Sequence, residues 1–374
     1  MTAETPRNEA PILQQWAPLT HCLDWHLGQM SWHRRGAQSF TTNEVPNLVN
    51  QGGMAAYRAA EVLFAACEEA DEQDELGEEI YAMEMAIGLG LFSVQLLDRF
   101  QSLCEAANKD WYQRLTWYAT DATAKMLVDA RENRIFARHE DRVVLGLVNA
   151  LEPKTLRRLD DGTVLDLQGK MMAVFHSYLL CVLPGNLFRR RTKGGQTDWS
   201  ILMAQTVLRH PEALDHFTEL SVNDVQVLAS SPKAEDVARL VPLYPLLDLN
   251  LSLAPVSEQE PQVEVELIRI ADAIEANLDA DKDKGGADDS PATDSTTDSA
   301  ADDPDERLTW VLHSSGAMTS IEATVEVLRP GGILVYRDYG PASAQTTSGS
   351  HLYQHYGAST AMGINHFALD SWLQ

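Results

Sequence analysis

A glycine-containing turn is the part of the sequence best suited to approach a ligand. Segment 84–90 reads EMAIGLG and lies between an apolar run and an amphipathic segment. Gly88 and Gly90 let the backbone come close to a ligand where a Cβ atom would block it, and the following helix presents its N-terminus there. Glu84 suits a cationic ligand better than a pyrophosphate. A plain tight turn is the alternative interpretation of two glycines alone.

Polar side chains end the next two apolar runs. Asp121 ends segment 118–121, and Asn149 precedes Ala150 in segment 147–150. In nucleotide-binding α/β folds an acid at the end of this strand accepts hydrogen bonds from ribose hydroxyls. A polar side chain at the end of the following strand can meet an adenine amino group. Each residue taken singly fits a turn, but their shared order at successive strand ends indicates a nucleotide site.

Strands and helices alternate around these residues. Apolar runs predict strands over 80–86, 114–121, 141–148, 169–184 and 333–340, and helical periodicity predicts helices over 54–70, 91–107, 123–134 and 319–328. The segment WSILMAQTVL (199–208) also looks helical. This alternation predicts an α/β fold with a mostly parallel sheet flanked by helices.

The 374 residues allow one large domain with insertions or two domains. We expect an N-terminal helical segment over 1–75 and a core built from 76–184 and 308–374. Residues 185–277, with several prolines, are expected to form an inserted cap or substrate region. Residues 278–307 hold 11 acidic and three basic residues and almost no large apolar side chain, which predicts a disordered acidic loop. A specific acidic recognition segment is its alternative interpretation.

Composition excludes several functional classes. The net charge of −26 repels phosphates, which disfavours a nucleic-acid partner. No apolar run has the length of a membrane span, and the N-terminus lacks the pattern of a secretory signal. Four separated cysteines form no CxxC pair, which indicates free thiols and a cytoplasmic location. His21, His26 and His33 lie near Asp24, but their spacing matches no familiar metal site, so we expect no metal.

Motifs along the chain resemble the class I methyltransferases, and within them the MidA-like family, which includes the mitochondrial complex I assembly arginine methyltransferase. Segment 84–90 resembles the class motif E-x-G-x-G-x-G. Segment 40–46 resembles the family's early F-x-T-x-P-E, and SYLLCVLP (177–184) its N-E-L-x-D-A-x-P. GILVYRDYG (332–340) resembles its D-Y-G strand, and 357–369 its late G-x-x-x-x-T-x-x-V-x-F-x-x-L stretch.

The resemblance implies a Rossmann-like methyltransferase fold and S-adenosylmethionine as cofactor, with a protein or small-molecule methyl acceptor. The residues expected to border the cofactor are Glu84, Ala86, Gly88, Gly90, Asp121, Asn149 and Ala150. The acceptor side is assigned to Tyr178, His176 and Asp338. His176 fits a core position equally well, Tyr178 could merely pack, and Asp338 could cap a turn.

Two departures from the family pattern keep other functions open. Ala86 replaces the first glycine of the turn, and segment 177–184 lacks the Asn, Glu and Asp of the family, which argues against arginine as the acceptor. A catalytically degenerate binding or assembly module is therefore one alternative. LRPGGILVYRDYG (328–340) also resembles the tRNA 3-methylcytidine methyltransferases, which gives a second alternative. A dehydrogenase is disfavoured because no G-x-G-x-x-G is present.

Overall fold

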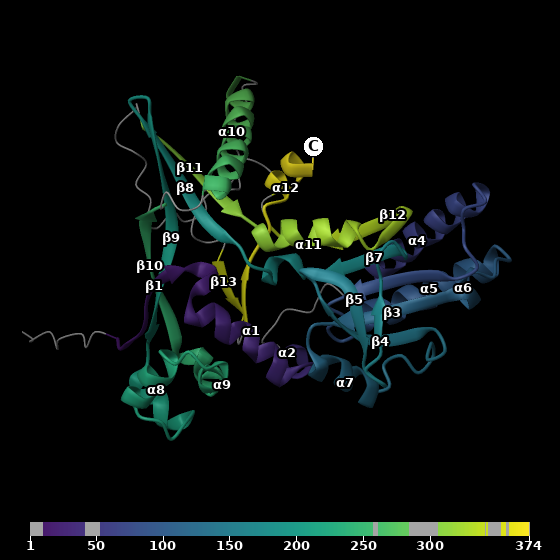
Figure 1. Ribbon diagram of the computed structural model, residues 1–374, viewed down its shortest axis with the longest axis horizontal. Helices are drawn as coiled ribbons and strands as arrows, with labels where there is room; N and C mark the ends of the chain where they lie inside the picture. The colour runs from purple at the N-terminus through teal and green to yellow at the C-terminus, as the bar shows by residue number, and fades with distance from the viewer. Residues whose placement is uncertain are drawn as a thin grey trace, which may run out of the picture.

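A seven-stranded sheet forms one half of the molecule (Figure 1). The computed structural model describes residues 10–41, 53–256, 261–283, 306–340, 342, 353–356 and 359–373. In spatial order the strands are β12 (Leu328–Arg337), β7 (Met171–Ser177), β2 (Ile80–Met85), β3 (Leu115–Asp121), β4 (Val143–Asn149), β5 (Glu152–Arg158) and β6 (Val164–Asp166). The first five are parallel, and β5 and β6 add an antiparallel edge. The expected mostly parallel α/β sheet is therefore confirmed.

The order of the strands reverses beside β2. From β2 the chain proceeds to β3 and β4 on one side, and later to β7 and β12 on the other. Connections that leave in opposite directions open a crevice outside the carboxyl ends of the strands. The sheet itself therefore places the predicted strand-end residues around one crevice.

Helices α4 (Met54–Glu72), α5 (Leu91–Ala106) and α7 (Ala124–Glu132) pack on one face of this sheet, and the short α6 (Trp111–Arg114) precedes β3. Their core includes the fully buried side chains Leu63, Phe100, Trp117 and Phe175. Helix α11 (Ser315–Val325) contacts β5 and β12. The apolar spacing that predicted helices over 54–70, 91–107, 123–134 and 319–328 is thus used for packing against the sheet.

A second, antiparallel sheet forms the other half of the molecule (Figure 1). Its strands are β1 (Ile12–Pro18), β8 (Asn186–Lys193), β9 (Gln196–Leu208), β10 (Leu247–Pro255) and β11 (Glu306–His313). It combines three strands of the predicted insertion, β8, β9 and β10, with β1 from the N-terminal segment and with β11. The helical interpretation of 199–208 is wrong, because these residues lie in β9. The end of β9 is buried on both faces, so its apolar run does not alternate and resembles a buried helix.

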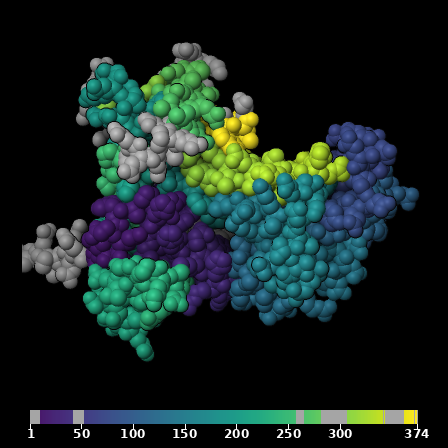
Figure 2. Space-filling model, viewed as in Figure 1, coloured from purple at the N-terminus to yellow at the C-terminus, as the bar shows by residue number. Residues whose placement is uncertain are grey.

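Residues 19–41 lie where the two halves of the molecule meet, and Figure 2 shows the purple N-terminal atoms beside both the green and the teal-blue ones. Helix α1 (Leu23–Arg35) contacts α7 beside the first sheet and β10 of the second, and α2 (Gln38–Thr41) follows it. The remaining elements are α8 (Val222–Ala229), α9 (Ala234–Ala238), α10 (Pro261–Asp283), α12 (His366–Leu373), the hairpin β13 (Tyr353–Tyr356) and β14 (Ser359–Met362), and the 3-10 helices η1 (Leu19–His21), η2 (Leu180–Val182), η3 (Pro211–His216) and η4 (Val241–Leu246). In the described part of the chain, no helix combines the length and the apolar character of a membrane span.

Several sequence predictions fall partly outside the described residues. In the acidic segment, 278–283 belong to α10 and 306–307 to β11, whereas 284–305 lie outside. Residues 42–46 and 357–358 of the family-like motifs also lie outside the described residues.

Candidate functional site

A cavity of about 600 Å³ opens at the carboxyl ends of the parallel strands. The β2–α5 turn, the ends of β3, β4 and β7, and helix α1 line it. Of the residues predicted to bind a cofactor or an acceptor, the following lie in its wall: Glu84, Ala86, Gly88, Asp121, Asn149, Ala150 and Tyr178. These residues are far apart in the sequence, and the parallel strands bring them together.

The β2–α5 turn uses backbone angles that favour glycine. Ala86, Gly88 and Gly90 have φ of 58°, 51° and 74°. A Cβ atom on Gly88 would lie 3.3 Å from the Phe40 ring, which also lines the cavity. A Cβ on Gly90 would instead meet Ile135 and Phe136 at 3.0 Å, so Gly90 serves packing behind the turn. Gly88 is therefore the glycine that keeps the cavity open.

Ala86 is strained by its positive φ, and we expect Ala86→Gly to stabilise the protein. The left-handed region costs a residue with a Cβ atom about 1–2 kcal/mol. Removing this strain stabilises the folded protein, but part of the gain is offset because glycine loses more backbone entropy on folding, at a cost of roughly 0.5–1 kcal/mol. Chemical denaturation should show a gain of about 0.5–1 kcal/mol. A loss of stability would show that the Ala86 methyl group contributes packing that outweighs the strain.

Glu84 is a buried carboxyl group at the end of β2. Its side chain is 2% exposed and accepts a hydrogen bond from the Ser93 hydroxyl, which in turn accepts one from Trp117 Nε1 at 2.7 Å. Burial raises the pKa of Glu84 to about 8, with a smaller upward contribution from the charge of Asp121, while the hydrogen bonds from Ser93 lower it. A cation bound in the cavity would favour the ionised form of Glu84.

The raised pKa of Glu84 predicts a pH dependence of stability for the ligand-free protein. The group is protonated in the folded state and ionised in the unfolded state between pH 4.5 and about 8, so the free energy of unfolding falls as pH rises through this window. We expect Glu84→Gln to flatten the slope between pH 6 and 8 by up to about 1.4 kcal/mol per pH unit. Denaturant titrations across this range test it, and parallel slopes for the two proteins would contradict it.

Asp121 ends β3 beside the glycine turn. Its side chain is 9% exposed, and its Oδ1 accepts a hydrogen bond from the Thr123 N–H at 2.9 Å. Burial raises its pKa to about 6, and hydrogen bonds from the backbone of Thr123 and Gly88 act in the opposite direction. Asp121 is thus mostly ionised at neutral pH and can accept hydrogen bonds from ligand hydroxyls.

The exposed Asn149 accepts a hydrogen bond from the Leu151 N–H at 3.1 Å and lines both the cavity and a neighbouring hollow of about 330 Å³.

Of the three residues predicted for the acceptor side, only Tyr178 is among the residues that line the cavity. Tyr178 lines the cavity and has φ of 55°, an unusual angle for a bulky residue. His176 is 2% exposed outside the lining, and its ring is stacked 5.8 Å from that of Tyr336. Burial lowers the pKa of His176 to about 3, so the ring is neutral. Asp338 accepts hydrogen bonds from the Cys181 and Tyr339 N–H groups at 3.1 and 2.9 Å, and thereby joins two loops.

The N-terminal segment contributes an aromatic wall to the cavity that was not predicted from the sequence. Trp25, Gln29 and Trp32 of α1, together with Phe40, line the cavity. Their positions i, i+4 and i+7 share one face of the helix, which is the signal that could have identified them. His33 also reaches the cavity, but the described residues contain no group of three or more potential metal ligands.

No protein-family model matches the sequence, and no curated protein matches it. The fold resembles a solved structure from Burkholderia thailandensis, a presumed methyl transferase bound to S-adenosyl-homocysteine. The TM-score is 0.51 at 13% identity, over 96% of this chain and 72% of that one. A second structure from the same organism, of an uncharacterized protein, gives a TM-score of 0.49 at 11% identity, over 96% of this chain and 71% of that one. At this identity, the first similarity shows a shared mixed α/β fold.

Proposed function

We propose that the chain is a methyltransferase of the Rossmann-like class I type that binds S-adenosylmethionine at the carboxyl ends of its parallel strands. The observation that carries the proposal is the gathering of the Gly88 turn, Glu84, Asp121 and Asn149 around one cavity at the point where the strand order reverses. The similar fold with bound S-adenosyl-homocysteine supports the same assignment.

The residues fit the chemistry of this cofactor. The cavity of about 600 Å³ is of the size that small-molecule sites have. Asp121 would accept hydrogen bonds from the ribose hydroxyls, and Asn149 with Ala150 would border the adenine. Glu84, buried and without a positively charged partner in the described cavity wall, would face the cationic methionine portion. The fit thus follows the strand order, with the adenine at β4, the ribose at β3 and the methionine portion at β2.

The bound cofactor would supply an electrophilic methyl group on a sulfonium. The role of the chain in such a transfer is to align donor and acceptor and to exclude water. The aromatic side chains of α1 and Phe40 would close the cavity over the glycine turn, and Tyr178 would face the acceptor. We infer a protein side chain or a small metabolite as acceptor.

A catalytically degenerate binding module is the second candidate. Ala86 occupies a glycine-type angle, and the segment after β7 offers Ser177, Tyr178 and Cys181 to the cavity. The nearby carboxylate of Asp338 already binds two backbone N–H groups. A guanidinium acceptor would need a carboxylate partner, so this arrangement disfavours arginine. The net charge of −26 likewise disfavours tRNA.

Transfer of labelled methyl groups separates the two candidates. Purified chain and methyl-labelled S-adenosylmethionine would be incubated with cell extract divided into protein, RNA and small-molecule fractions, with Gly88→Val, which should not bind the cofactor, as the control enzyme. Label that enters the protein or small-molecule fraction only with the wild type supports the proposed function. Label in RNA would support the tRNA alternative, and cofactor binding without any transfer would support the degenerate module.

A further inference from the structure

Helix α1 joins the two halves of the molecule, and its last turns carry part of the aromatic wall. Its first half packs in the second half of the molecule, where Trp25 and Leu27 are almost fully buried. Its other end contacts α7 beside the first sheet. Trp32 lies in this part, and its ring is 5.5 Å from that of Phe40 in α2. The position of both rings in the cavity wall therefore depends on how the end of α1 is held.

Asp129 of α7 holds the turn between α1 and α2. Its side chain is 9% exposed, and its Oδ2 accepts a hydrogen bond from the Ala37 N–H at 3.0 Å. Its Oδ1 forms an ion pair with Lys125, four residues earlier on the same helix. The carbonyl oxygen of Ala37 in turn accepts a hydrogen bond from the Phe40 N–H at 3.1 Å. A carboxylate on α7 thus fixes the backbone that carries Phe40.

Gly36 allows this turn to come close to α7. It ends α1 with φ of 53°, and its N–H donates a hydrogen bond to the Trp32 carbonyl oxygen at 3.1 Å. A Cβ atom at Gly36 would lie 2.5 Å from Asp129 Oδ2 and 2.7 Å from Lys125 Cγ. A residue without a side chain is therefore needed for the carboxylate to reach the Ala37 N–H. We call this meeting of Asp129 with Gly36 and Ala37 the Asp129 contact.

Helix α7 also carries residues of the cavity itself. It follows Asp121 at the end of β3, and Asp121 and Met126 both line the cavity. Asp129 lies one turn beyond Met126 and is not among the lining residues. One helix therefore connects the end of β3 with the aromatic wall that α1 and α2 contribute.

We propose that Asp129 is a positioning residue, which keeps Trp32 and Phe40 in the cavity wall and thereby slows the release of the cofactor. This inference rests on the proposed function. Without the Asp129 contact, the end of α1 would populate positions in which the two rings leave the wall. The apparent affinity for a ligand falls with the fraction of protein in the binding-competent position, and the dissociation rate rises.

Variants of the Asp129 contact test this role. Calorimetry would give the Kd of S-adenosylhomocysteine, and stopped-flow tryptophan fluorescence its dissociation rate. We expect Asp129→Ala to raise Kd about 10-fold, mostly through faster dissociation. Gly36→Ala should act in the same direction, because its methyl group displaces the carboxylate. Asp129→Asn, whose amide oxygen can still accept the Ala37 N–H, should stay within about threefold of the wild type.

Two local variants serve as controls. Lys125→Met removes the ion pair but leaves the hydrogen bond between Asp129 and Ala37, and it should bind like the wild type. Equal weakening by Lys125→Met would assign the effect to the ion pair instead. Gly162→Ala imposes the same kind of backbone strain as Gly36→Ala, since Gly162 has φ of 72° and nothing lies within 4 Å of its Cβ position. It should not change the dissociation rate.

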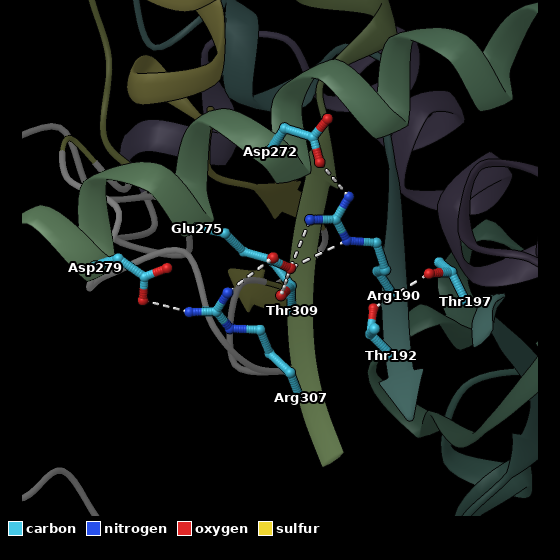
Figure 3. Close-up of polar contacts among 8 residues, drawn as sticks. All are labelled: Arg190, Thr192, Thr197, Asp272, Glu275, Asp279, Arg307 and Thr309. Carbon is cyan, nitrogen blue, oxygen red and sulfur yellow. Dashed lines mark hydrogen bonds and ion pairs between the residues drawn. The ribbon is translucent and has the colours of Figure 1, made fainter. Parts of the chain in front are cut away.

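Glu275→Ala is the control for a general loss of stability. Figure 3 shows Glu275 of α10 between Arg190 of β8 and Arg307 of β11, with which it forms ion pairs at 2.6 and 3.1 Å. Arg190 is 7% exposed, so removal of its partner should destabilise the fold. None of the eight residues drawn in Figure 3 lines the cavity. This variant should therefore lose thermal stability and keep the dissociation rate of the wild type.

Unchanged dissociation rates in Asp129→Ala and Gly36→Ala would overturn the role of Asp129. Equal acceleration in Glu275→Ala would show that loss of stability alone explains the effect. If the two variants of the Asp129 contact do not fold, amide hydrogen exchange of the wild type decides the question. The amides of residues 36–41 should become more protected when S-adenosylhomocysteine binds, and unchanged exchange there would refute the proposal. A wild type that does not bind S-adenosylhomocysteine would refute the proposed function itself.

Discussion

Replacement of Gly88 by valine should abolish binding of S-adenosylmethionine, a loss of more than about 100-fold in affinity. The residue has φ of 51°, and any Cβ atom there would lie 3.3 Å from the ring of Phe40, which also lines the cavity. The two additional methyl groups of valine would occupy space that the ligand needs. The strain of a β-branched residue at this angle adds a cost of about 1–3 kcal/mol to folding.

Gly162→Val is the matched control for this strain. Gly162 has φ of 72°, but its Cβ would meet nothing within 4 Å. Both variants should therefore lose stability in thermal unfolding, and only Gly88→Val should lose the ligand in calorimetry. Wild-type affinity of Gly88→Val would place the ligand away from the glycine turn.

Asp121→Ala should weaken cofactor binding by about 1–3 kcal/mol, the cost of losing a charged hydrogen-bond partner. The carboxylate is ionised above its pKa of about 6, whereas Glu84 titrates in both proteins, so the affinity of the wild type should fall more steeply than that of the variant as pH drops below 6. Titrations of S-adenosylhomocysteine at pH 5 and pH 8 measure both effects.

Asp161→Ala controls for the local turn. The carboxylates of Asp121 and Asp161 each accept a hydrogen bond from the N–H two residues later, at 2.9 Å in both cases. Asp161 lies on the exposed β5–β6 turn, outside the residues that line the cavity. Loss of affinity in the Asp161 variant, or unchanged affinity in the Asp121 variant, would refute the ribose assignment.

The parallel strands could be predicted because their sequences carry the evidence themselves. β2, β3 and β7 are buried on both faces and appear as continuous apolar runs, each followed by a turn or a helix with apolar spacing. The same property misled the prediction at β9, where a strand buried at one end looks like a buried helix. Nothing local in β1 or β11 indicates that they pair into one sheet with β8 and β9, because that pairing depends on distant segments.

The candidate site could be predicted where it depends on strand ends alone. Glu84, Asp121 and Asn149 line one cavity because parallel strands end at the same edge. Elsewhere, whether a side chain reaches the cavity depends on the direction in which its residue points. This direction distinguishes the buried His176 from Tyr178, which lines the cavity. The contribution of α1 depends on tertiary packing, which the sequence shows only as helical spacing.

Calorimetric titration of the purified chain with S-adenosylmethionine and S-adenosylhomocysteine, with NAD as the comparison ligand, tests the central claim most directly. The account predicts micromolar binding of both S-adenosyl compounds, with one site per chain and no measurable binding of NAD. Absence of binding to either compound, or equal binding of NAD, would contradict the assignment of this cavity to S-adenosylmethionine.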